Sequence, residues 1–296
     1  MATASSSQSQ TAHVAVVTVS YGSDDVLGPF LSSLTGSSAL PLRVVVADNK
    51  PAGDPHVIAA LAREAGAYYL PLESNRGYGH AINEAVRGLP AEIDWVVISN
   101  PDVTVGSGSI DILLTTAHDD ANIAAVGPQI LSSDGEVYPS ARTIPSLRSG
   151  VGHALFADLW PKNPWTRAYR RETGSHLMTR DAGWLSGAFL MVRRSVMDEL
   201  NGFDESYFMY FEDVDLGYRI GKLGLRNVYV PGAVVIHTGA HSTRGGESAR
   251  MIRAHHDSAQ RFLFKKYGGP LLWPVRVILG VGLGARARIE QHRILP

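Results

Sequence analysis

Short apolar segments alternate with amphipathic ones through the first hundred residues, and this alternation constrains the fold more than any other feature. Residues 13–21 (HVAVVTVSY), 43–48 (RVVVAD) and 94–99 (DWVVIS) are rich in valine and are bounded by polar residues, as buried strands are. Residues 57–65 and 77–86 repeat apolar side chains at helical spacing. Strands that alternate with helices build a mostly parallel sheet with helices on both faces. The sequence therefore predicts an α/β fold.

The second half of the chain has a less regular pattern. A turn signal at Asp134-Gly135 predicts a hairpin that joins residues 129–131 to residues 137–138. Two neighbouring histidines, His255 and His256, fall on the last predicted helix and are given no function. The further predicted helices cover residues 107–118, 212–223 and 251–266, and the further predicted strands cover residues 184–193, 228–230 and 233–236.

Composition excludes several classes of protein. The formal net charge of −1 argues against binding of nucleic acid through bulk charge. Cysteine is absent, which excludes disulfides, cysteine-bound metals and cysteine nucleophiles. Residues 1–12 are polar and lack the apolar core of a secretory signal, so they predict a disordered tail. The apolar stretch 271–283 is too short to span a membrane and is interrupted by Pro274 and Arg276, so a soluble chain is expected.

Polar residues follow the first two predicted strands at the points where these strands end. Ser20 and Tyr21 end the first strand, and Asp48 ends the second. In open parallel sheets, ligands bind beyond the carboxyl ends of the strands. Asp48 is therefore either a cap for the following helix or an acceptor of hydrogen bonds from a nucleotide.

The strand at residues 94–99 runs into Asn100-Pro101-Asp102. The Asp102 carboxylate, aided by the Asn100 amide, would suit Mg²⁺ or Mn²⁺ bound to phosphate oxygens. An ordinary Asx turn explains the same residues equally well. His237 follows a predicted strand and could serve as a metal ligand, although a buried structural histidine is the commoner outcome.

The sequence Asn75-Arg76-Gly77 opens a predicted helix that also carries Asn83. Small residues, helix amides and one arginine make a plausible cradle for a diphosphate, and a simple glycine turn is the alternative. The dinucleotide-binding pattern G-x-G-x-x-G is not present, because Ile82 stands where its third glycine belongs. This absence argues against a nicotinamide-dependent dehydrogenase.

Three acidic residues open the predicted helix at residues 212–223. Asp213 and Asp215 point to nearly opposite sides of a helix, so both cannot face one cleft. Arg219 lies four residues after Asp215 and offers it an ion pair, which leaves Asp213 the freer carboxylate. A purely structural role at the positive end of the helix dipole is the alternative. The neighbouring residues Phe208, Tyr210 and Phe211 favour a catalytic role for Asp213. Their apolar side chains would partly exclude water from a carboxylate and so raise its basicity.

Taken in order, these motifs resemble those of the family 2 glycosyltransferases, which have the GT-A fold. The resemblance runs from Val14 to His237, and within the family it is greatest to the rhamnosyltransferases of cell-wall linker synthesis. The motifs that carry it are VTVSY, VVADN, NRGYGHAIN, NPDV, WLSGAFLMVRR, FMYFEDVDLGYR and PGAVVIH, together with YPSAR, WPKNPW and AHST.

The resemblance implies an inverting transfer of L-rhamnose from dTDP-L-rhamnose to polyprenyl-diphosphate-linked N-acetylglucosamine, with Asp213 as the catalytic base. Asp102 and His237 match the binding site for a divalent cation, Mg²⁺ or Mn²⁺. Many relatives have an aspartate where this chain has Asn100, so metal dependence is less certain here. Residues that match the nucleotide-sugar site are Ser20, Tyr21, Asp48, Asn75, Arg76, Gly77, Asn83, Asn100 and Asp102. Residues that match the acceptor site are Arg142, Trp184, Ser186, Gly187 and Glu212.

The expected organisation is a GT-A catalytic domain at residues 13–239 with a C-terminal helical extension at residues 240–296. Residues 13–102 would bind the nucleotide sugar and residues 103–239 the acceptor. Beyond Gly269 the chain carries a net charge of +3 beside apolar residues, which suits either an interfacial segment on an anionic membrane or a helix packed on the domain. A lipid-linked acceptor implies a peripheral location on the cytoplasmic face of the plasma membrane.

Two alternatives and one open question remain at this stage. The same fold would serve a transferase that uses another dTDP- or UDP-sugar, such as UDP-galactofuranose. A non-catalytic module that binds nucleotide sugars or glycolipids is the rival from another class. A homo-oligomer is possible, and the sequence does not decide it.

Overall fold

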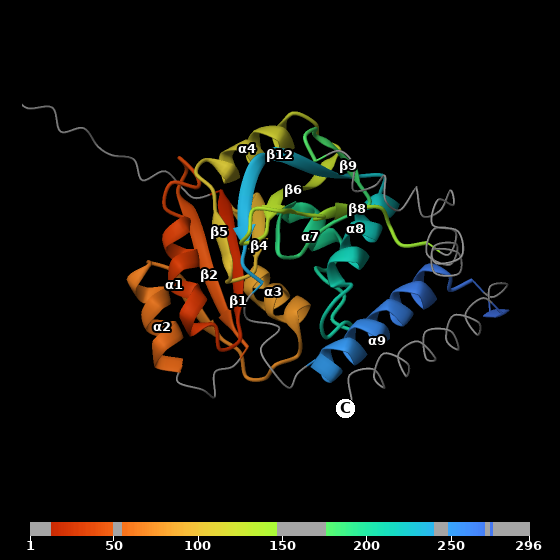
Figure 1. Ribbon diagram of the computed structural model, residues 1–296, viewed down its shortest axis with the longest axis horizontal. Helices are drawn as coiled ribbons and strands as arrows, with labels where there is room; N and C mark the ends of the chain where they lie inside the picture. Colours follow the sequence, from red (N-terminus) through yellow and green to blue (C-terminus); the bar gives the residue numbers. More distant parts are fainter. Residues whose placement is uncertain (1–12, 50–54, 147–175, 240–247, 270–272, 275–296) are drawn as a thin grey trace, which may run out of the picture.

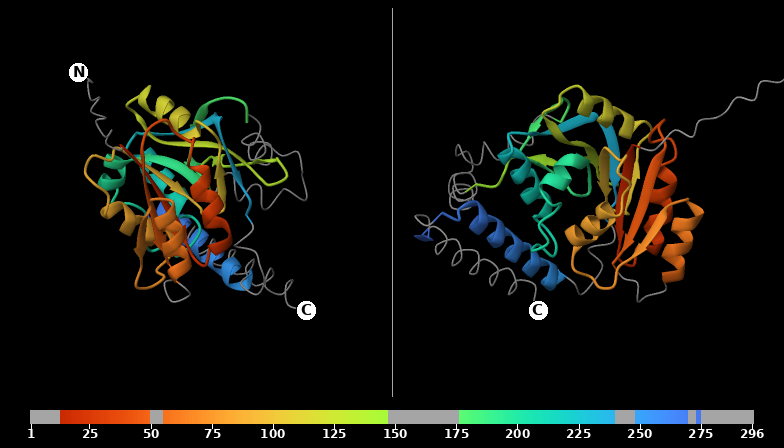
Figure 2. Two further views of the ribbon diagram at one scale, coloured as in Figure 1. Left: turned by 90° about the vertical axis from the view of Figure 1, so that its left-hand side faces the viewer. Right: turned by 180° about the vertical axis from the view of Figure 1, so that it is seen from behind.

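The computed structural model describes residues 13–49, 55–146, 176–239, 248–269 and 273–274 (Figure 1). A single mixed sheet runs through the molecule in the order β3-β2-β1-β4-β11-β6-β12-β5. Helices cover both of its faces, as Figures 1 and 2 show. The predicted α/β fold, a mostly parallel sheet flanked by helices, is confirmed.

The first half of the sheet is wholly parallel. β1 (Val14–Ser20) pairs with β2 (Leu42–Asp48) on one side and with β4 (Trp95–Ser99) on the other, and β2 pairs with β3 (Tyr68–Pro71). All seven residues of β1 are buried, because this central strand is covered on both faces. The parallel pairing brings the carboxyl ends of β1, β2 and β4 to one edge of the sheet.

The second half of the sheet mixes directions. β11 (Phe189–Arg193) is antiparallel to β4 and to β6 (Ile123–Leu131), whereas β12 (Arg226–His237) runs parallel to β6. β5 (Val103–Val105) follows β4 in the chain and pairs antiparallel with the end of β12. In this pairing Val103 lies opposite His237. Four short strands complete the set. β7 (Val137–Tyr138) lies beside β6 and β9 (Arg180–Ala182) beside β12, whereas β8 (Ala141–Arg142) and β10 (Trp184–Leu185) form a separate small sheet.

Two apolar clusters fill the space between the sheet and its helices. Val14 and Val16 of β1 belong to the cluster under α1 (Asp24–Ser33), α2 (Pro55–Glu64) and α4 (Ser109–His118). Ala15 and Val17, which point to the other face, belong to the cluster under α3 (Tyr78–Arg87), α7 (Arg194–Glu199) and α8 (Glu212–Lys222). The period of two in β1 therefore divides the core between the two faces.

Two strand predictions were wrong in detail. Residues 184–193 form two strands, because the chain turns at Ser186–Ala188 so that β10 pairs with β8 while β11 enters the main sheet. Residues 228–230 and 233–236 form one strand, β12, which accommodates Pro231 and Gly232 in an irregularity between Val230 and Val234. The predicted hairpin of β6 with β7 is confirmed.

The last described helix, α9 (Ser248–Lys266), packs beside α8 and the segment before it (Figures 1 and 2). Phe262 of α9 is fully buried in a third apolar cluster with Tyr207 and Val214. Among the helices that the structure describes, none has the length and apolar character needed to cross a bilayer. The predicted tail at residues 1–12 and most of residues 270–296 lie outside the described residues.

Candidate active site

Buried polar residues gather where β1 and β2 end. Ser20 and Asp48 are partners in the parallel register, and both are almost completely buried. Asn49 follows Asp48, and the backbone amide of Asn49 donates to the Ser20 carbonyl at 2.8 Å. No hydrogen-bond partner for the Ser20 hydroxyl is found among the described residues. A buried hydroxyl without a protein partner is a natural contact for a bound ligand. Tyr21, by contrast, is 52% exposed.

Asp48 is oriented by a neighbouring strand. The Tyr69 hydroxyl of β3 donates to Asp48 Oδ2 at 2.9 Å. Burial, together with the nearby carboxylate, raises the pKa of Tyr69 to about 12. Tyr69 therefore remains a hydrogen-bond donor throughout the physiological range, which holds the Asp48 carboxylate in one orientation at the sheet edge.

The end of β4 and the end of β12 bring an aspartate and a histidine together. His237 is paired with Val103 in the antiparallel register of β12 and β5, and its Nε2 lies 3.0 Å from Asp102 Oδ1. The Asn100 side-chain amide lies 3.3 Å from the same nitrogen. The Thr238 amide donates to the Asp102 carbonyl at 3.0 Å and fixes the local backbone. Residues that are 135 positions apart in the sequence thus meet at one point.

The 3.0 Å between His237 Nε2 and Asp102 Oδ1 is the distance of a hydrogen bond or ion pair. Adjacent ligands at about 2.1 Å from an octahedral ion are also separated by about 3 Å, so the two side chains could supply part of a cation site if that bond opened. The described residues contain no group of three or more histidine, aspartate or glutamate side chains arranged for a metal. A cation at this place would therefore take its remaining ligands from water or from a phosphate-bearing substrate.

Gly77 sits at the start of α3 in a conformation that requires glycine. Its φ is +106°, and a Cβ atom there would lie 2.3 Å from the Phe208 carbonyl oxygen. Asn75 Oδ1 accepts a hydrogen bond from the Gly77 amide at 3.0 Å, and Asn49 Nδ2 donates to the Gly77 carbonyl at 3.3 Å. The predicted diphosphate cradle at Asn75–Gly77 is therefore held in place by Asn49 at the end of β2 and by Phe208 in the segment that precedes α8.

Two of the residues matched to the nucleotide-sugar site make contacts within the protein. Asn83 is buried, donates to the Phe203 carbonyl at 2.9 Å and accepts from the Phe203 amide at 2.8 Å. Arg76 is mostly exposed and lies 3.4 Å from Glu205. Glu205 also lies 2.8 Å from Nδ1 of the buried His80. Both residues therefore tie α3 to residues 203–205.

Asp213, the predicted base, lies in the first turn of α8 and faces the break between β10 and β11. The Gly187 amide donates to Asp213 Oδ2 at 2.9 Å, and the Val214 amide donates to Oδ1 at 2.8 Å. Burial raises the pKa of Asp213 above its ordinary value, and these amides act against that rise. Asp215 takes the predicted structural role, because it is fully buried and lies 2.6 Å from Arg219.

The acid beside Asp213 is also buried. Glu212 is 8% exposed, and no partner for its Oε2 is found in the described part of the chain. Burial and the charge of Asp213 raise the pKa of Glu212 to about 8. Burial and the neighbouring carboxylate therefore favour the protonated form of Glu212.

The two residues before α8 have unusual backbone conformations. Tyr210 and Phe211 both have φ of +67°. The left-handed region is unfavourable for bulky side chains, and each such residue costs about 1–3 kcal/mol. Strain of this kind persists where the surrounding structure imposes it, and here it occurs directly before Glu212 and Asp213 in the first turn of α8.

Tyr78 contacts the segment that orients Asp213. Its hydroxyl donates to the Gly187 carbonyl at 3.0 Å. Burial and the charges of Glu212, Asp213 and Asp102 raise the pKa of Tyr78 well above its ordinary value. The Asn100 backbone amide donates to the Ala188 carbonyl at 2.9 Å, and Ala188 follows Gly187, whose amide donates to Asp213. Backbone hydrogen bonds therefore link the turn that carries Asp102 to the segment that orients Asp213.

The remaining residues matched to the acceptor site lie on the β8–β10 sheet. The Arg142 guanidinium lies 5.8 Å from the centre of the Trp184 ring, and the Trp184 indole donates to the Thr143 carbonyl at 3.1 Å. The Ser186 amide donates to the Ser140 carbonyl at 2.8 Å. The positive charge of Arg142 acts on Asp213 and lowers its pKa, so this wall borders the base.

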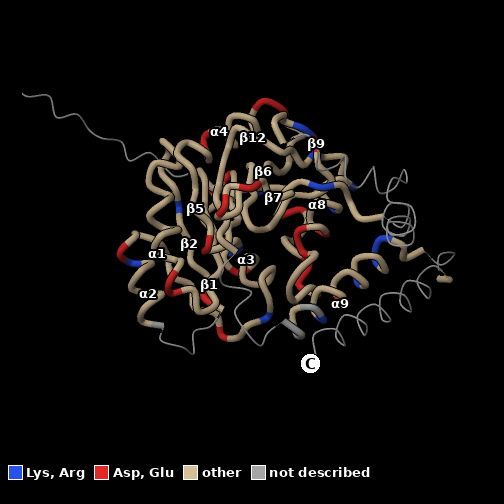
Figure 3. Tube along the Cα trace, viewed as in Figure 1, with Lys and Arg blue, Asp and Glu red and all other residues tan. Residues whose placement is uncertain are grey.

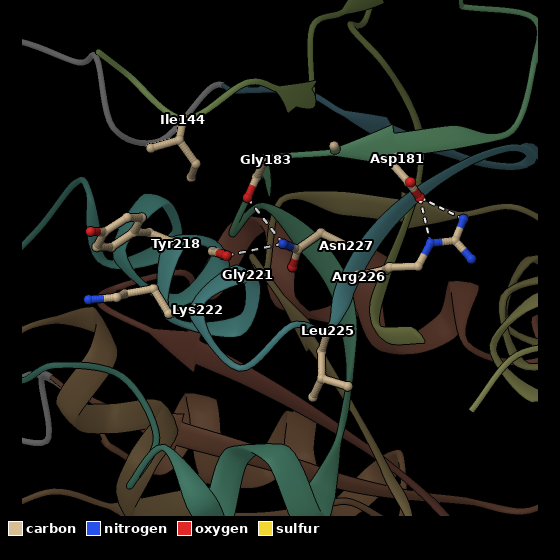
Figure 4. A pocket seen from close by; sticks show the side chains of 11 residues that line it. Ile144, Asp181, Gly183, Tyr218, Gly221, Lys222, Leu225, Arg226 and Asn227 are labelled. Carbon is tan, nitrogen blue, oxygen red and sulfur yellow. Dashed lines mark hydrogen bonds and ion pairs between the residues drawn. The ribbon is translucent and has the colours of Figure 1, made fainter. Parts of the chain in front are cut away.

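A cavity of about 340 Å³ lies elsewhere, between the later turns of α8 and the start of β12 (Figure 4). Gly217, Gly221 and Lys222 line it on the helix side, and Asn227 lines it from β12. The Asn227 amide donates to the carbonyls of Gly183 and Gly217, both at 3.1 Å. None of the site residues predicted from the sequence lines this cavity.

Sequence reasoning missed Tyr78 and Tyr69, and it noted Asn49 only as a polar residue at the end of a strand. Tyr78 stands within a recognised motif but was given no role, and Tyr69 lies in a strand that carries no motif. Tyr78 follows the glycine that opens α3, and Asn49 follows Asp48, so both stand where ligands bind in open sheets. The role of Tyr69 requires the pairing of β2 with β3, in which Val46 is opposite Tyr69.

Comparison with known proteins agrees with this geometry. Residues 11–255 match the family model described as glycosyltransferase like family 2. The chain is 46% identical over 275 residues, 88% of each chain, to N-acetylglucosaminyl-diphospho-decaprenol L-rhamnosyltransferase of Mycobacterium tuberculosis. It is 28% identical over 265 residues, 86% of this chain and 93% of the relative, to rhamnosyltransferase WbbL of Escherichia coli.

Solved structures support the fold. A mannosyltransferase of Pyrobaculum calidifontis in complex with GDP-Man and Mn²⁺ superposes with a TM-score of 0.56 at 16% identity, over 96% of this chain and 76% of that one. Residues 1–349 of TarS from S. aureus superpose with a TM-score of 0.52 at 14% identity, over 83% of this chain and 64% of that one. The chain belongs to the family 2 glycosyltransferases and is a glycosyltransferase with the GT-A fold.

Proposed function

We propose that this glycosyltransferase moves L-rhamnose, with inversion, from dTDP-L-rhamnose to N-acetylglucosamine linked through diphosphate to a polyprenol, as a step in cell-wall assembly. The 46% identity to the mycobacterial rhamnosyltransferase supports both the sugar and the acceptor. The observation that carries the proposal is the position of Asp213, which accepts a hydrogen bond from the Gly187 amide. The Tyr78 hydroxyl donates to the Gly187 carbonyl, and the Asn100 backbone amide donates to the carbonyl of the next residue, Ala188, so the turn that carries Asp102 is bonded to the same segment.

The nucleotide and the diphosphate would occupy the edge formed by β1, β2 and β4. Ser20 offers a hydroxyl without a protein partner among the described residues, and Asp48 offers a carboxylate oriented by Tyr69. Asp48 would accept hydrogen bonds from the thymine base. Helix α3 begins at Tyr78, whose amide donates to the Phe208 carbonyl, and the next two amides of its first turn would suit an anionic diphosphate.

Asp102 and His237 would hold a divalent cation, Mg²⁺ or Mn²⁺, beside the diphosphate. When bound, such a cation neutralises the charge that develops on the departing dTDP. Asn100 supplies an amide where many relatives have a carboxylate, which reduces the negative charge of the site. We therefore expect weaker metal binding than in a site with two carboxylates.

Asp213 would take the proton from the acceptor hydroxyl as its oxygen attacks the anomeric carbon of rhamnose. The new glycosidic bond forms on the face opposite to the departing dTDP, whose bond to the sugar breaks in the same step. Burial favours the protonated form of Asp213 and so increases its strength as a base. General-base assistance of this kind contributes about 10²–10⁴-fold. Arg142, Trp184, Ser186, Gly187 and Glu212 would border the acceptor.

The acceptor is anchored in a membrane, so we propose that the enzyme acts as a peripheral protein on its cytoplasmic face. The basic and apolar residues after Gly269 suit an interfacial segment on an anionic leaflet. Flotation with anionic vesicles tests this, with the full-length chain compared with one that ends at Gly269. Equal flotation of the two would contradict an interfacial role for this segment.

A donor screen tests the proposed reaction. The full-length chain is incubated with a short polyprenyl-diphosphate-N-acetylglucosamine acceptor and with dTDP-L-rhamnose or UDP-galactofuranose, each with and without Mg²⁺ or Mn²⁺. We expect rhamnosyl transfer from dTDP-L-rhamnose and a product of inverted anomeric configuration by NMR. Transfer from the UDP-sugar alone would replace the proposed donor, and binding without turnover would favour a non-catalytic module.

A further inference from the structure

The strained turn at Tyr210–Phe211 is held from two sides. On one side the Tyr78 amide of α3 donates to the Phe208 carbonyl at 3.1 Å, and Gly77 lies so close that a Cβ atom there would be 2.3 Å from the same carbonyl oxygen. On the other side lies α9. Since both residues of the turn are bulky and have positive φ, the surrounding contacts must impose the conformation.

Helix α9 contacts every residue of the segment 209–211. The Ser258 hydroxyl donates to the Met209 carbonyl at 2.8 Å. The His255 ring meets the Tyr210 and Phe211 rings edge-on, with centroids 5.5 and 5.4 Å apart. These contacts are local to the turn, and sequence analysis assigned no function to His255.

Two further contacts extend this grip to α8. Phe262 is fully buried, and its ring lies 5.9 Å from that of Phe211 and 5.7 Å from that of Tyr218. Lys265 Nζ lies 2.7 Å from the buried Asp215. Figure 3 shows the acidic residues along α8 and the basic residues on α9. Ser258, Phe262 and Lys265 lie beyond residue 255, where the family match ends.

We infer that α9 acts as a clamp on the Tyr210–Phe211 turn and that Ser258 is a positioning residue for the glycosyl transfer. The first hydrogen bond of α8 runs from the Asp215 amide to the Phe211 carbonyl at 2.8 Å, so the conformation of Phe211 sets the direction of the first turn. Relaxation of this turn would move Asp213 away from the Gly187 amide. The inference rests on the proposed role of Asp213 as base.

A matched pair of variants tests the clamp. Ser258→Ala removes a buried hydroxyl that donates to a backbone carbonyl at 2.8 Å. Ser37→Ala removes the same kind of bond, from a buried hydroxyl to the Leu34 carbonyl at 2.8 Å, in a part of the chain that carries no site residue. Both variants should lose similar stability, so melting temperature serves as the common reference.

The two variants should differ in exchange and in turnover. In Ser258→Ala we expect faster hydrogen exchange of the Gly187 amide and a kcat about 10-fold lower, with the KM for the donor unchanged, because a small misplacement of a reacting group is costly. Ser37→Ala should keep wild-type exchange at Gly187 and wild-type kcat. Unchanged exchange at Gly187 in Ser258→Ala, or lost protection with unchanged kcat, would overturn the inference.

A second substitution, Tyr210→Gly, tests the inference independently of any general loss of stability in Ser258→Ala. Glycine adopts positive φ without strain, so Tyr210→Gly should relieve one of the two strained residues and reduce what the clamp must hold. We expect Ser258→Ala to lower kcat by less than about 3-fold in the Tyr210→Gly background, and an undiminished loss there would contradict the clamp. If the wild type transfers no sugar, or if Asp213→Asn is fully active, the proposed function fails, whereas exchange at Gly187 still reports on the clamp itself.

Discussion

The Gly187 amide and the Asp213 carboxylate lie 2.9 Å apart, and this contact joins the turn between β10 and β11 to the first turn of a helix 26 residues later. The contact exists because β10 ends at Leu185 in the small sheet with β8, whereas β11 begins at Phe189 in the main sheet. A continuous strand would use the Gly187 amide in its own ladder. The interruption is therefore what frees a backbone donor to orient the base.

Substitution of the base should abolish most of the activity. Asp213→Asn keeps the shape and a hydrogen-bond acceptor for Gly187 but removes the basic carboxylate. We expect kcat to fall by about 10²–10⁴-fold while the affinity for dTDP is retained. Steady-state kinetics and calorimetric titration with dTDP measure the two quantities, and near-normal turnover would remove Asp213 from this role. Glu136→Gln on the exposed β6–β7 turn is the control.

Neutralisation of Glu212 should stabilise the protein at mildly alkaline pH. Its folded pKa of about 8 exceeds its ordinary value of 4.5, so the stability of the wild type falls as pH rises from about 4.5 to about 8. Glu212→Gln does not titrate. Its free energy of unfolding in urea should therefore exceed that of the wild type by about 1–3 kcal/mol at pH 8, with a smaller difference at pH 5. Equal differences at the two pH values would contradict the buried protonated state.

A carboxylate at position 100 should strengthen metal dependence. Asn100→Asp adds a negative oxygen ligand beside Asp102 and His237, and divalent cations prefer such ligands. We expect half-maximal activity at about 10-fold lower Mn²⁺ in this variant, and His237→Ala should shift it in the opposite direction. Activity is measured against free Mn²⁺ concentration after treatment with EDTA. Identical Mn²⁺ curves for all three proteins would exclude a cation at this position.

Alanine at Gly77 should be far more damaging than alanine at another glycine with positive φ. Gly77→Ala combines a strained φ with a Cβ that would lie 2.3 Å from the Phe208 carbonyl oxygen. Gly135 has φ of +85°, and no atom of the described residues lies within 4 Å of the place that a Cβ would take there. Gly135→Ala therefore isolates the strain alone, about 1–2 kcal/mol. We expect Gly77→Ala to lose at least about twice as much free energy of unfolding, and equal losses would show that the close approach is unimportant.

The sequence predicted the parallel half of the sheet closely, because residues 13–21, 43–48 and 94–99 combine apolar runs with clear boundaries. It also predicted that Asp213 and Asp215 would diverge, since their separation on a helix is fixed by helical geometry. The pairing of Asp102 with His237 was inferred from family resemblance alone, because no local pattern brings together residues so far apart in the chain.

Features that depend on tertiary contacts were missed or misjudged. Residues 184–193 have the composition of one strand, and only the competing partner β8 shows why they form two. The positive φ of Tyr210 and Phe211 contradicts their local preference for extended backbone, so no sequence signal predicts it. The contacts of Asn83 and Arg76 with residues 203–205 require the position of a segment more than a hundred residues away.

The complete burial of Phe262 has a practical consequence for anyone who shortens this protein. A chain cut before Ser248 would uncover the Phe211 and Tyr218 rings and would leave the buried Asp215 without one of its two cationic neighbours. A cut at residue 255, where the family match ends, would remove Phe262 and Lys265 in the same way. Either truncation should yield an aggregation-prone product, because Phe262 fills an apolar cluster with Tyr207 and Val214.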